Sequence, residues 1–272
     1  MDNSSEPLDF SLLPDVSDFD PEKDDPEIAA FDAHMQVRAN ALHYIFGKSH
    51  PEDSVWSPST DHELFLNWPG GAIMCFPPQG DRQNWYFVTH GLSQPPMEDD
   101  LIPVALDEYL DWREARGEEE VSGWGIELVI STRDFYDWPL NLLMELVQYL
   151  LFNENSQIIL PGHRLPLAGP ILPATNPLLN HLLAVTSSEY PSTIRLPGGL
   201  CSLIHLIGIT EAEVNRARQF KGPTGSQVLQ SVLVKLGVGC LTDPERPCLT
   251  THPQFEEVWQ EAEQEVKESK SS

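Results

Sequence analysis

Two histidines stand where a general base could act. His90 ends an aromatic-rich run of strand character, and His163 follows a Pro-Gly turn. A histidine at such a place can take a proton from a nucleophile, which here would be a residue such as Cys75, Cys201 or Ser93. Nothing in the sequence pairs these groups, so a hydrolase is one hypothesis, and a structural hydrogen bond is the alternative for each histidine.

Motifs for metals, phosphates and activated serines do not occur in the sequence. It contains no HExxH, no GxxxxGK[ST], no GxGxxG and no GxSxG. The four cysteines lack CxxC spacing, which favours free thiols in a reducing compartment over a disulfide or metal site. We therefore predict no catalytic set, no cofactor and no metal ligands, and this favours a binding protein over an enzyme.

Acidic residues are concentrated in three segments. The chain of 272 residues has 42 acidic and 16 basic residues, a formal net charge of −26. Most of the excess lies in residues 1–32, 98–120 and 253–272, and the rest is nearly balanced. No basic stripe remains for unaided binding of nucleic acid or an anionic membrane. The acidity suits a basic protein partner, although solubility alone also explains it.

The elements around these residues follow from periodicity. A helix is predicted at 26–46, because apolar residues recur three and four positions apart before Gly47. Strands are predicted at 64–66, 72–76, 85–89 and 125–132, the last with Glu127 on a solvent-facing side. A second helix begins at Asp137, placed as its cap. The later elements are an apolar central strand at 201–209 containing His205, helices at 211–220 and 224–236, and an exposed acidic helix or tail at 255–267.

This order predicts an α+β fold in which a mixed, largely antiparallel sheet packs with helices. Residues 1–25 are expected to form a flexible acidic tail, although their apolar residues could dock on the domain. Residues 26–250 form one domain, and residues 251–272 an acidic C-terminal helix or tail, so that residues 33–252 should fold alone. The acidic N-terminus and the lack of a long apolar run predict a cytoplasmic protein.

Six segments together resemble the Suppressor of fused (SUFU) family. They are Trp85–Ser93, which ends in a Gly-Leu-Ser turn, Gly123–Ile130, Trp138–Phe152, Pro161–His163, Leu206–Glu213 and Leu241–Pro247. The family-motif positions are Gly91, Leu92, Ser93, Trp138, Pro139, Gly162, His163, Thr242, Asp243 and Arg246, with structural or binding roles.

The resemblance implies the fold of the SUFU amino-terminal domain and a protein-binding role without catalysis. Animal members bind an extended peptide of their transcription-factor partner between this domain and a second one, for which we expect no counterpart in this chain. Single-domain members of the family look bacterial, and many of them are thought to be immunity proteins that neutralise toxins, so the resemblance implies such a role. The chain departs from the family after Ser93, where Gln94–Met97 and an acidic run follow.

The leading hypothesis is therefore a cytoplasmic, non-catalytic domain that binds and neutralises another protein. The partner would be a basic toxin domain or an extended peptide, and neither nucleic acid nor membrane. One alternative is a hydrolase that uses His90 or His163. The other is a peptide-binding module that adds a strand at an exposed sheet edge.

Overall fold

A computed structural model describes residues 7–11, 26–49, 55–56, 68, 70–95, 104–153, 155–173 and 178–270. The strand predicted at 64–66 lies outside these residues. The helices are α1 (Pro26–Phe46), α3 (Val104–Glu114), α4 (Trp138–Phe152), α5 (Glu211–Ala217), α6 (Thr224–Lys235), α7 (Phe255–Ser269) and a 3-10 turn at Leu249–Thr251. The strands are β1 (Leu8–Asp9), β2 (Val55–Trp56), β3 (Ala72–Phe76), β4 (Trp85–His90), β5 (Val121–Thr132), β6 (Arg164–Pro166), β7 (Leu179–Val185), β8 (Thr193–Leu196) and β9 (Gly199–Thr210).

The strands form one mixed sheet, as the element order predicts. Its main order is β1-β8-β9-β5-β4-β3-β2, and β7 also pairs with β9 and carries β6. The neighbours β5 and β9 are parallel, β1 is parallel to β8, and the other pairs are antiparallel. The long strand β9 is central, as predicted, because β8 and β7 pair with its two ends while β5 follows its other edge.

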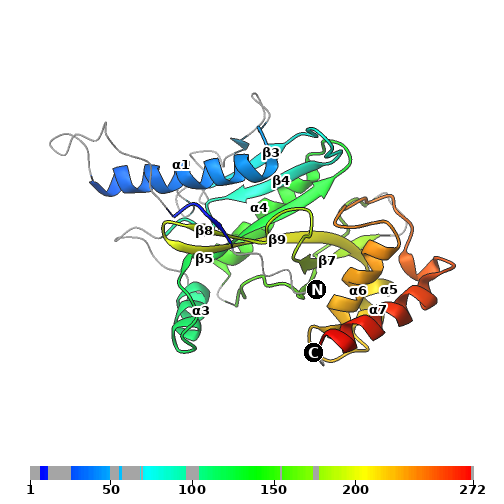
Figure 1. Ribbon diagram of the computed structural model, residues 1–272. Coiled ribbons are helices and arrows are strands. Elements are labelled where there is room, and N and C mark those ends of the chain that lie inside the picture. The colour runs from blue at the N-terminus through cyan, green and yellow to red at the C-terminus, as the bar shows by residue number, and fades with distance from the viewer. Residues whose placement is uncertain are drawn as a thin grey trace.

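Two helices cover opposite faces of the sheet (Figure 1). Alternate residues of the central strands, such as Phe87, Ile126 and Ile204, pack with the apolar face of α4. The intervening residues, such as Val88 and Val129, pack with the end of α1. Because the side chains of a strand alternate between its two faces, the period-2 pattern is buried on both sides here.

A helical layer covers the far end of β7 and β9. Helices α5, α6 and α7 lie together there (Figure 1), and their apolar side chains surround Ile207 and Ile209 of β9. Helix α5 begins at Thr210, whose side chain accepts from the Glu213 backbone while the Glu213 side chain accepts from the Thr210 backbone. This is the capping box that the Thr-x-x-Glu pattern predicts.

Three local predictions are wrong. Glu127 is fully buried, because α1 covers the face to which it points. Asp137 precedes α4 but makes no side-chain capping bond, and Pro139 alone marks the start of the helix. The apolar spacing that predicts the helix at 26–46 places Ile28 on its buried face, but Ile28 is 58% exposed, and the buried face of α1 contains Val37, Arg38 and Ala41 among others.

Parts of the acidic segments belong to the folded body. Residues 104–114 form α3, from which Leu106 is buried against the α4 side of the core. The C-terminal segment is helical, but its inner face is not exposed, because Phe255 and Trp259 are buried beside α5 and α6. Leu8 and Phe10 of the N-terminal segment lie against α1 and β8.

Candidate functional site

The Gly91-Leu92-Ser93 turn is held by the buried carboxylate of Glu127. One oxygen, Oε1, accepts from the backbone N–H of Gly91 at 3.0 Å and from the backbone N–H and hydroxyl of Ser93 at 2.9 and 2.6 Å. The other oxygen accepts from the Thr89 hydroxyl at 2.6 Å. Four donors on one carboxylate fix this turn to β5, so Ser93 is an anchor and not a free nucleophile.

The same turn packs closely on the start of β5. Gly91 has φ of 132° and Gly123 has φ of 55°, values that favour glycine. A Cβ on Gly123 would lie 2.3 Å from the Gln94 carbonyl oxygen. The Trp124 N–H donates to the Leu92 carbonyl at 2.8 Å. The two motif segments, 91–93 and 123–125, therefore pack directly on each other, and their glycines allow this close contact.

Arg38 of α1 supplies the positive charge for this buried site. Its Nε lies 3.9 Å from Glu127 Oε1, and both side chains are inaccessible to solvent. Its Nη1 donates to the Gln94 side chain at 2.9 Å, while Nε and Nη2 have no hydrogen-bond partner among the described residues. The pair thus ties α1 to β5 and to the residue that follows the Gly-Leu-Ser turn.

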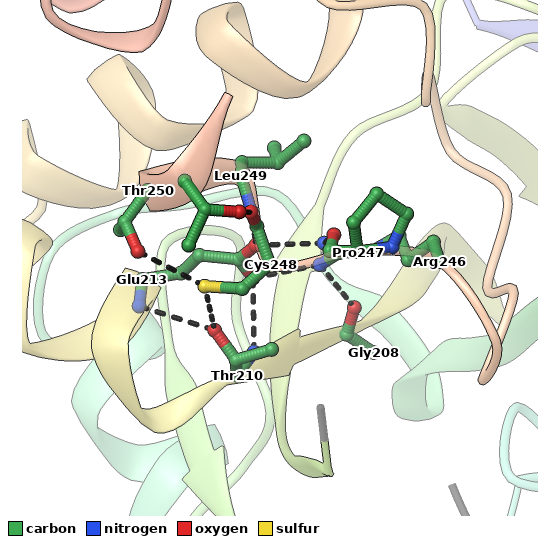
Figure 2. A network of polar contacts seen from close by, with 9 residues as sticks. Gly208, Thr210, Glu213, Arg246, Pro247, Cys248, Leu249 and Thr250 are labelled. Atoms are coloured by element: carbon green, nitrogen blue, oxygen red, sulfur yellow. Dashed lines mark hydrogen bonds and ion pairs between the residues drawn. The ribbon is translucent and has the colours of Figure 1, made fainter. Parts of the chain in front are cut away.

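A second buried ion pair fixes the 241–247 loop (Figure 2). Nη1 and Nη2 of Arg246 donate to the two carboxylate oxygens of Glu213, both at 2.7 Å. Nη2 also donates to the Gly208 carbonyl, and Glu213 additionally accepts from the backbone of Leu249 and Thr210. A planar guanidinium is suited to this two-bond geometry, and Arg246 therefore joins β9, α5 and the loop.

Two other motif residues of this loop also make internal contacts. The Thr242 hydroxyl accepts from the Gly208 N–H at 2.9 Å, and the Thr242 N–H donates to the Ser131 carbonyl. Asp243 accepts from the Glu245 N–H at 2.9 Å and lies 3.8 Å from Arg133. The loop is thereby fixed beside the end of β5.

Gly162 and His163 belong to a turn that precedes β6 in the chain and lies in space between β7 and α6. The Gly162 N–H donates to the Ala184 carbonyl, and the Ala184 N–H donates to the His163 carbonyl. Ser226 of α6 donates to the Gly162 carbonyl at 2.6 Å. Gly162 has φ of 93°, so the turn needs glycine and serves to join the sheet to α6.

Neither predicted catalytic histidine meets a nucleophile among the described residues. Burial, followed by the charge of Arg38, lowers the pKa of His90 to about 3, and its Nε2 has no partner. His163 accepts at Nδ1 from the Leu160 N–H at 3.4 Å, and burial lowers its pKa. Residues 91–93, 138–139, 162–163 and 242–246 therefore do not converge on one reaction centre.

The structure contains a serine–histidine pair that the sequence did not reveal. Ser131 Oγ lies 3.1 Å from His205 Nε2, and the Tyr190 hydroxyl lies 2.8 Å from His205 Nδ1. Because Ser131 donates to the Cys240 carbonyl and Tyr190 needs an acceptor, Nε2 carries the proton and cannot act as a base. All three polar groups stabilise the core, and burial lowers the pKa of His205 to about 3. The sequence signal for this buried polar cluster was His205 itself, a polar residue inside the apolar strand at 201–209.

The described part of the chain contains neither a metal-binding cluster nor a membrane-spanning helix. There, no group of three His, Cys, Asp or Glu residues could hold a metal ion. The helices in these ranges are too short or too polar to cross a membrane.

An exposed loop gathers aromatic and charged side chains at the motif-rich end of β5. We call residues 133–137 the aromatic loop. Phe135 and Tyr136 are 38% and 39% exposed, and Phe135 packs edge-on against Trp85 with ring centroids 5.1 Å apart. Partial burial, followed by the charges of Asp134 and nearby carboxylates of the 241–247 loop, raises the pKa of Tyr136.

The predicted positions Trp138 and Pro139 begin α4 directly after the aromatic loop. Asp243 lies next to the loop through its contact with Arg133. The structure thus brings the 138–139 and 242–246 motifs to one surface, while Gly91–Ser93 lies at the opposite end of β4. Aromatic residues and arginine are enriched in protein-binding interfaces, so the aromatic loop, with Arg133, Phe135 and Tyr136, is the candidate interaction site.

Fold and site together define a mixed-sheet α+β domain whose motif residues secure loops and whose exposed aromatic groups are suited to contact with a protein. The family model for Suppressor of fused protein (SUFU) matches residues 68–247. The chain belongs to the Suppressor of fused family.

The curated relatives include the Suppressor of fused homologs of Mus musculus and Homo sapiens. Each is 24% identical over 172 residues, which is 60% of this chain but 32% of the relative. The chain therefore matches about a third of their length.

Three solved structures share the fold. A chain of the Sufu–Fu complex has 16% identity and a TM-score of 0.55, covering 85% of this chain and 96% of that one. Drosophila Suppressor of Fused has 20% identity and a TM-score of 0.51, and the match covers 70% of this chain and 45% of that one. A putative SUFU homolog from Neisseria gonorrhoeae has 13% identity and a TM-score of 0.52, and the match covers 81% of this chain and 97% of that one. The predicted fold class and family are confirmed.

Proposed function

We propose that this chain is a non-catalytic, cytoplasmic protein that binds and neutralises another protein through the aromatic loop. The observation that carries the proposal is the exposed Phe135–Tyr136 pair on a rigid support. Phe135 lies over Trp85 and Phe87 of β4, so binding need not order it from a mobile state. A preorganised aromatic surface loses less entropy on association and therefore binds more tightly.

Family membership supports the protein-binding part of the proposal. A structural relative was crystallised as part of the Sufu–Fu complex, and the same type of role is proposed for this chain. The buried acidic and basic groups described above are engaged in internal contacts, which leaves the surface as the functional part. We extend the proposal to a toxin-neutralising, immunity-type role, which the acidic charge of the chain supports.

The charge of the chain favours a basic partner. Its net charge of −26 would accelerate encounter with a basic toxin domain, and this attraction weakens as salt rises. Asp134, Asp243 and Glu245 place carboxylates around the aromatic loop. The proposed interface thus has an aromatic centre and an acidic rim.

The test uses the full chain as bait for the proteins encoded beside its gene. We expect one neighbour to bind the wild type, and a Phe135→Ala/Tyr136→Ala variant to bind about 30-fold or more weakly, the loss typical of a hot spot. Phe152→Ala is the matched control, because Phe152 is 41% exposed and lies at the end of α4 remote from the aromatic loop.

A functional readout completes the test. Co-expression with the bound neighbour should restore growth if that neighbour is toxic, and the double variant should not restore it. Failure of every neighbour to bind at low salt would overturn the proposal, as would equal binding by the double variant.

A further inference from the structure

The N-terminal segment of the chain lies on an edge of the sheet. Leu8 and Asp9 pair in parallel with Ile194 and Arg195 of β8, and the Phe10 N–H donates to the Arg195 carbonyl at 2.8 Å. Beyond this segment no described strand continues the sheet on that side. Residues 7–11, here called the strap, therefore supply the backbone partners that the edge of β8 would otherwise lack.

The side chains of the strap alternate between an apolar surface of the domain and solvent. Leu8 and Phe10 pack on an apolar cluster that α1 and the β8–β9 hairpin form together. The Phe10 ring also meets the Tyr44 ring edge-on, with centroids 5.8 Å apart. Asp9 points outward between them and is exposed. Recognition thus needs only an extended backbone with two apolar side chains on either side of an acidic one.

The contacts of the strap are few enough to be exchanged. Strand β1 has two residues, and neither Leu8 nor Phe10 is fully buried. Arg195, which faces Asp9, also forms an ion pair with Glu119, so removal of the strap does not leave its charge unpaired. With the strap in place, Val37, Ala41 and Ile194 beneath it are buried, so the strap covers an apolar surface of the domain.

We propose that the edge of β8 beside α1 is a second docking site, for an extended partner segment with an apolar–acidic–apolar pattern, and that the strap occupies it as an internal competitor. Backbone pairing gives such an interaction its affinity, and the apolar surface that receives the two alternate side chains gives it selectivity. This inference goes beyond the proposed function, because the edge lies at the start of the β5–β9 pair, opposite the aromatic loop.

The test measures exchange with a synthetic probe. A fluorescent peptide of residues 5–13 is titrated against the full wild-type chain and a full-length Leu8→Ser/Phe10→Ser variant. Weakening the strap should expose the edge, so we expect at least tenfold tighter binding to the variant. Ile28→Ser is the control, because Ile28 is an exposed apolar residue of α1 and should leave binding at the wild-type level.

A reversible lock provides the second measurement. Asp9 and Arg195 are paired Cα partners, and the native cysteines are buried, so Asp9→Cys/Arg195→Cys should oxidise only at the strap. The oxidised protein should lose peptide binding, and reduction should restore it.

Three results would overturn the proposal. They are equal peptide affinity in the wild type and the Leu8→Ser/Phe10→Ser variant, undiminished binding of a peptide carrying those two serines, and binding to the locked protein. A disulfide-linked dimer of the Asp9→Cys/Arg195→Cys protein would instead assign the edge to a second copy of this chain. Because the probe requires no neighbour protein, these results are independent of the bait experiment.

Discussion

Replacement of Arg246 by methionine tests whether the buried ion pair of Figure 2 holds the C-terminal half of the domain together. In the wild type, Glu213 accepts two bonds from Arg246, one from Leu249 and one from Thr210. Arg246→Met keeps most of the side-chain volume but removes the two guanidinium bonds to Glu213, together with those to the Gly208 and Pro247 carbonyls. It leaves a fully buried carboxylate with only two backbone donors.

The expected cost follows from the unpaired charge. Removal of one partner of a buried ion pair destabilises a protein by about 3–5 kcal/mol. For a domain of about 150–250 residues this lowers Tm by roughly 6–20 °C. The double variant Glu213→Gln/Arg246→Met should be more stable than Arg246→Met alone, because its glutamine is neutral and can still accept from the Thr210 N–H.

Urea unfolding followed by circular dichroism measures these free energies. Lys235→Met is the matched control: it breaks two ion pairs of partly exposed side chains, to Glu261 and Glu265, and should cost less than about 1 kcal/mol. The reasoning fails if Arg246→Met costs no more than the control. It also fails if the added Glu213→Gln change destabilises Arg246→Met further.

Two more predictions concern the core. Burial lowers the pKa of His205 to about 3, so protonation favours the unfolded chain: the stability that neutral His205 provides is complete above about pH 6.5 and is lost as pH falls toward 3. Between pH 6 and 4, His205→Gln should make the slope of unfolding free energy against pH shallower by about 1.4 kcal/mol per unit, and an unchanged slope would contradict this. Trp259→Ala should lower the free energy of unfolding in urea by about 3–5 kcal/mol. The control Val234→Ala, at a 56% exposed site of α6, should lower it by less than about 0.5 kcal/mol. Equal losses would show that α7 does not contribute to the stability of the domain.

Local sequence signals predicted most elements but not what covers them. Apolar periodicity gave the extent of α1, and the Thr210–Glu213 capping box gave the start of α5. The alternation in β5 correctly set Glu127 apart from its neighbours Ile126 and Leu128. It could not show that α1 crosses that face and carries Arg38, because this contact joins residues far apart in the chain.

Charge was the weakest guide to domain boundaries. Residues 253–272 are acidic, yet Trp259 fills the space between α5 and α6, so a chain cut to residues 33–252 would expose that core. In a short amphipathic helix the outward charges dominate the composition, while a few apolar residues determine the packing. The spacing of Phe255, Trp259 and Ala262 was the signal that marked the buried face.

The residues that resemble the family are those that the fold itself requires. Gly91 and Ser93 close a turn on Glu127, and Arg246 closes a loop on Glu213. Such positions identify the fold because substitution there breaks it, and for the same reason they are poor indicators of partner choice. Selectivity is expected where side chains are exposed on rigid supports, as Phe135 is on β4, and where a sheet edge is covered only by the strap. Substitutions at these two surfaces should therefore change partner binding without a change in folding stability, whereas substitutions at the motif residues should change both together.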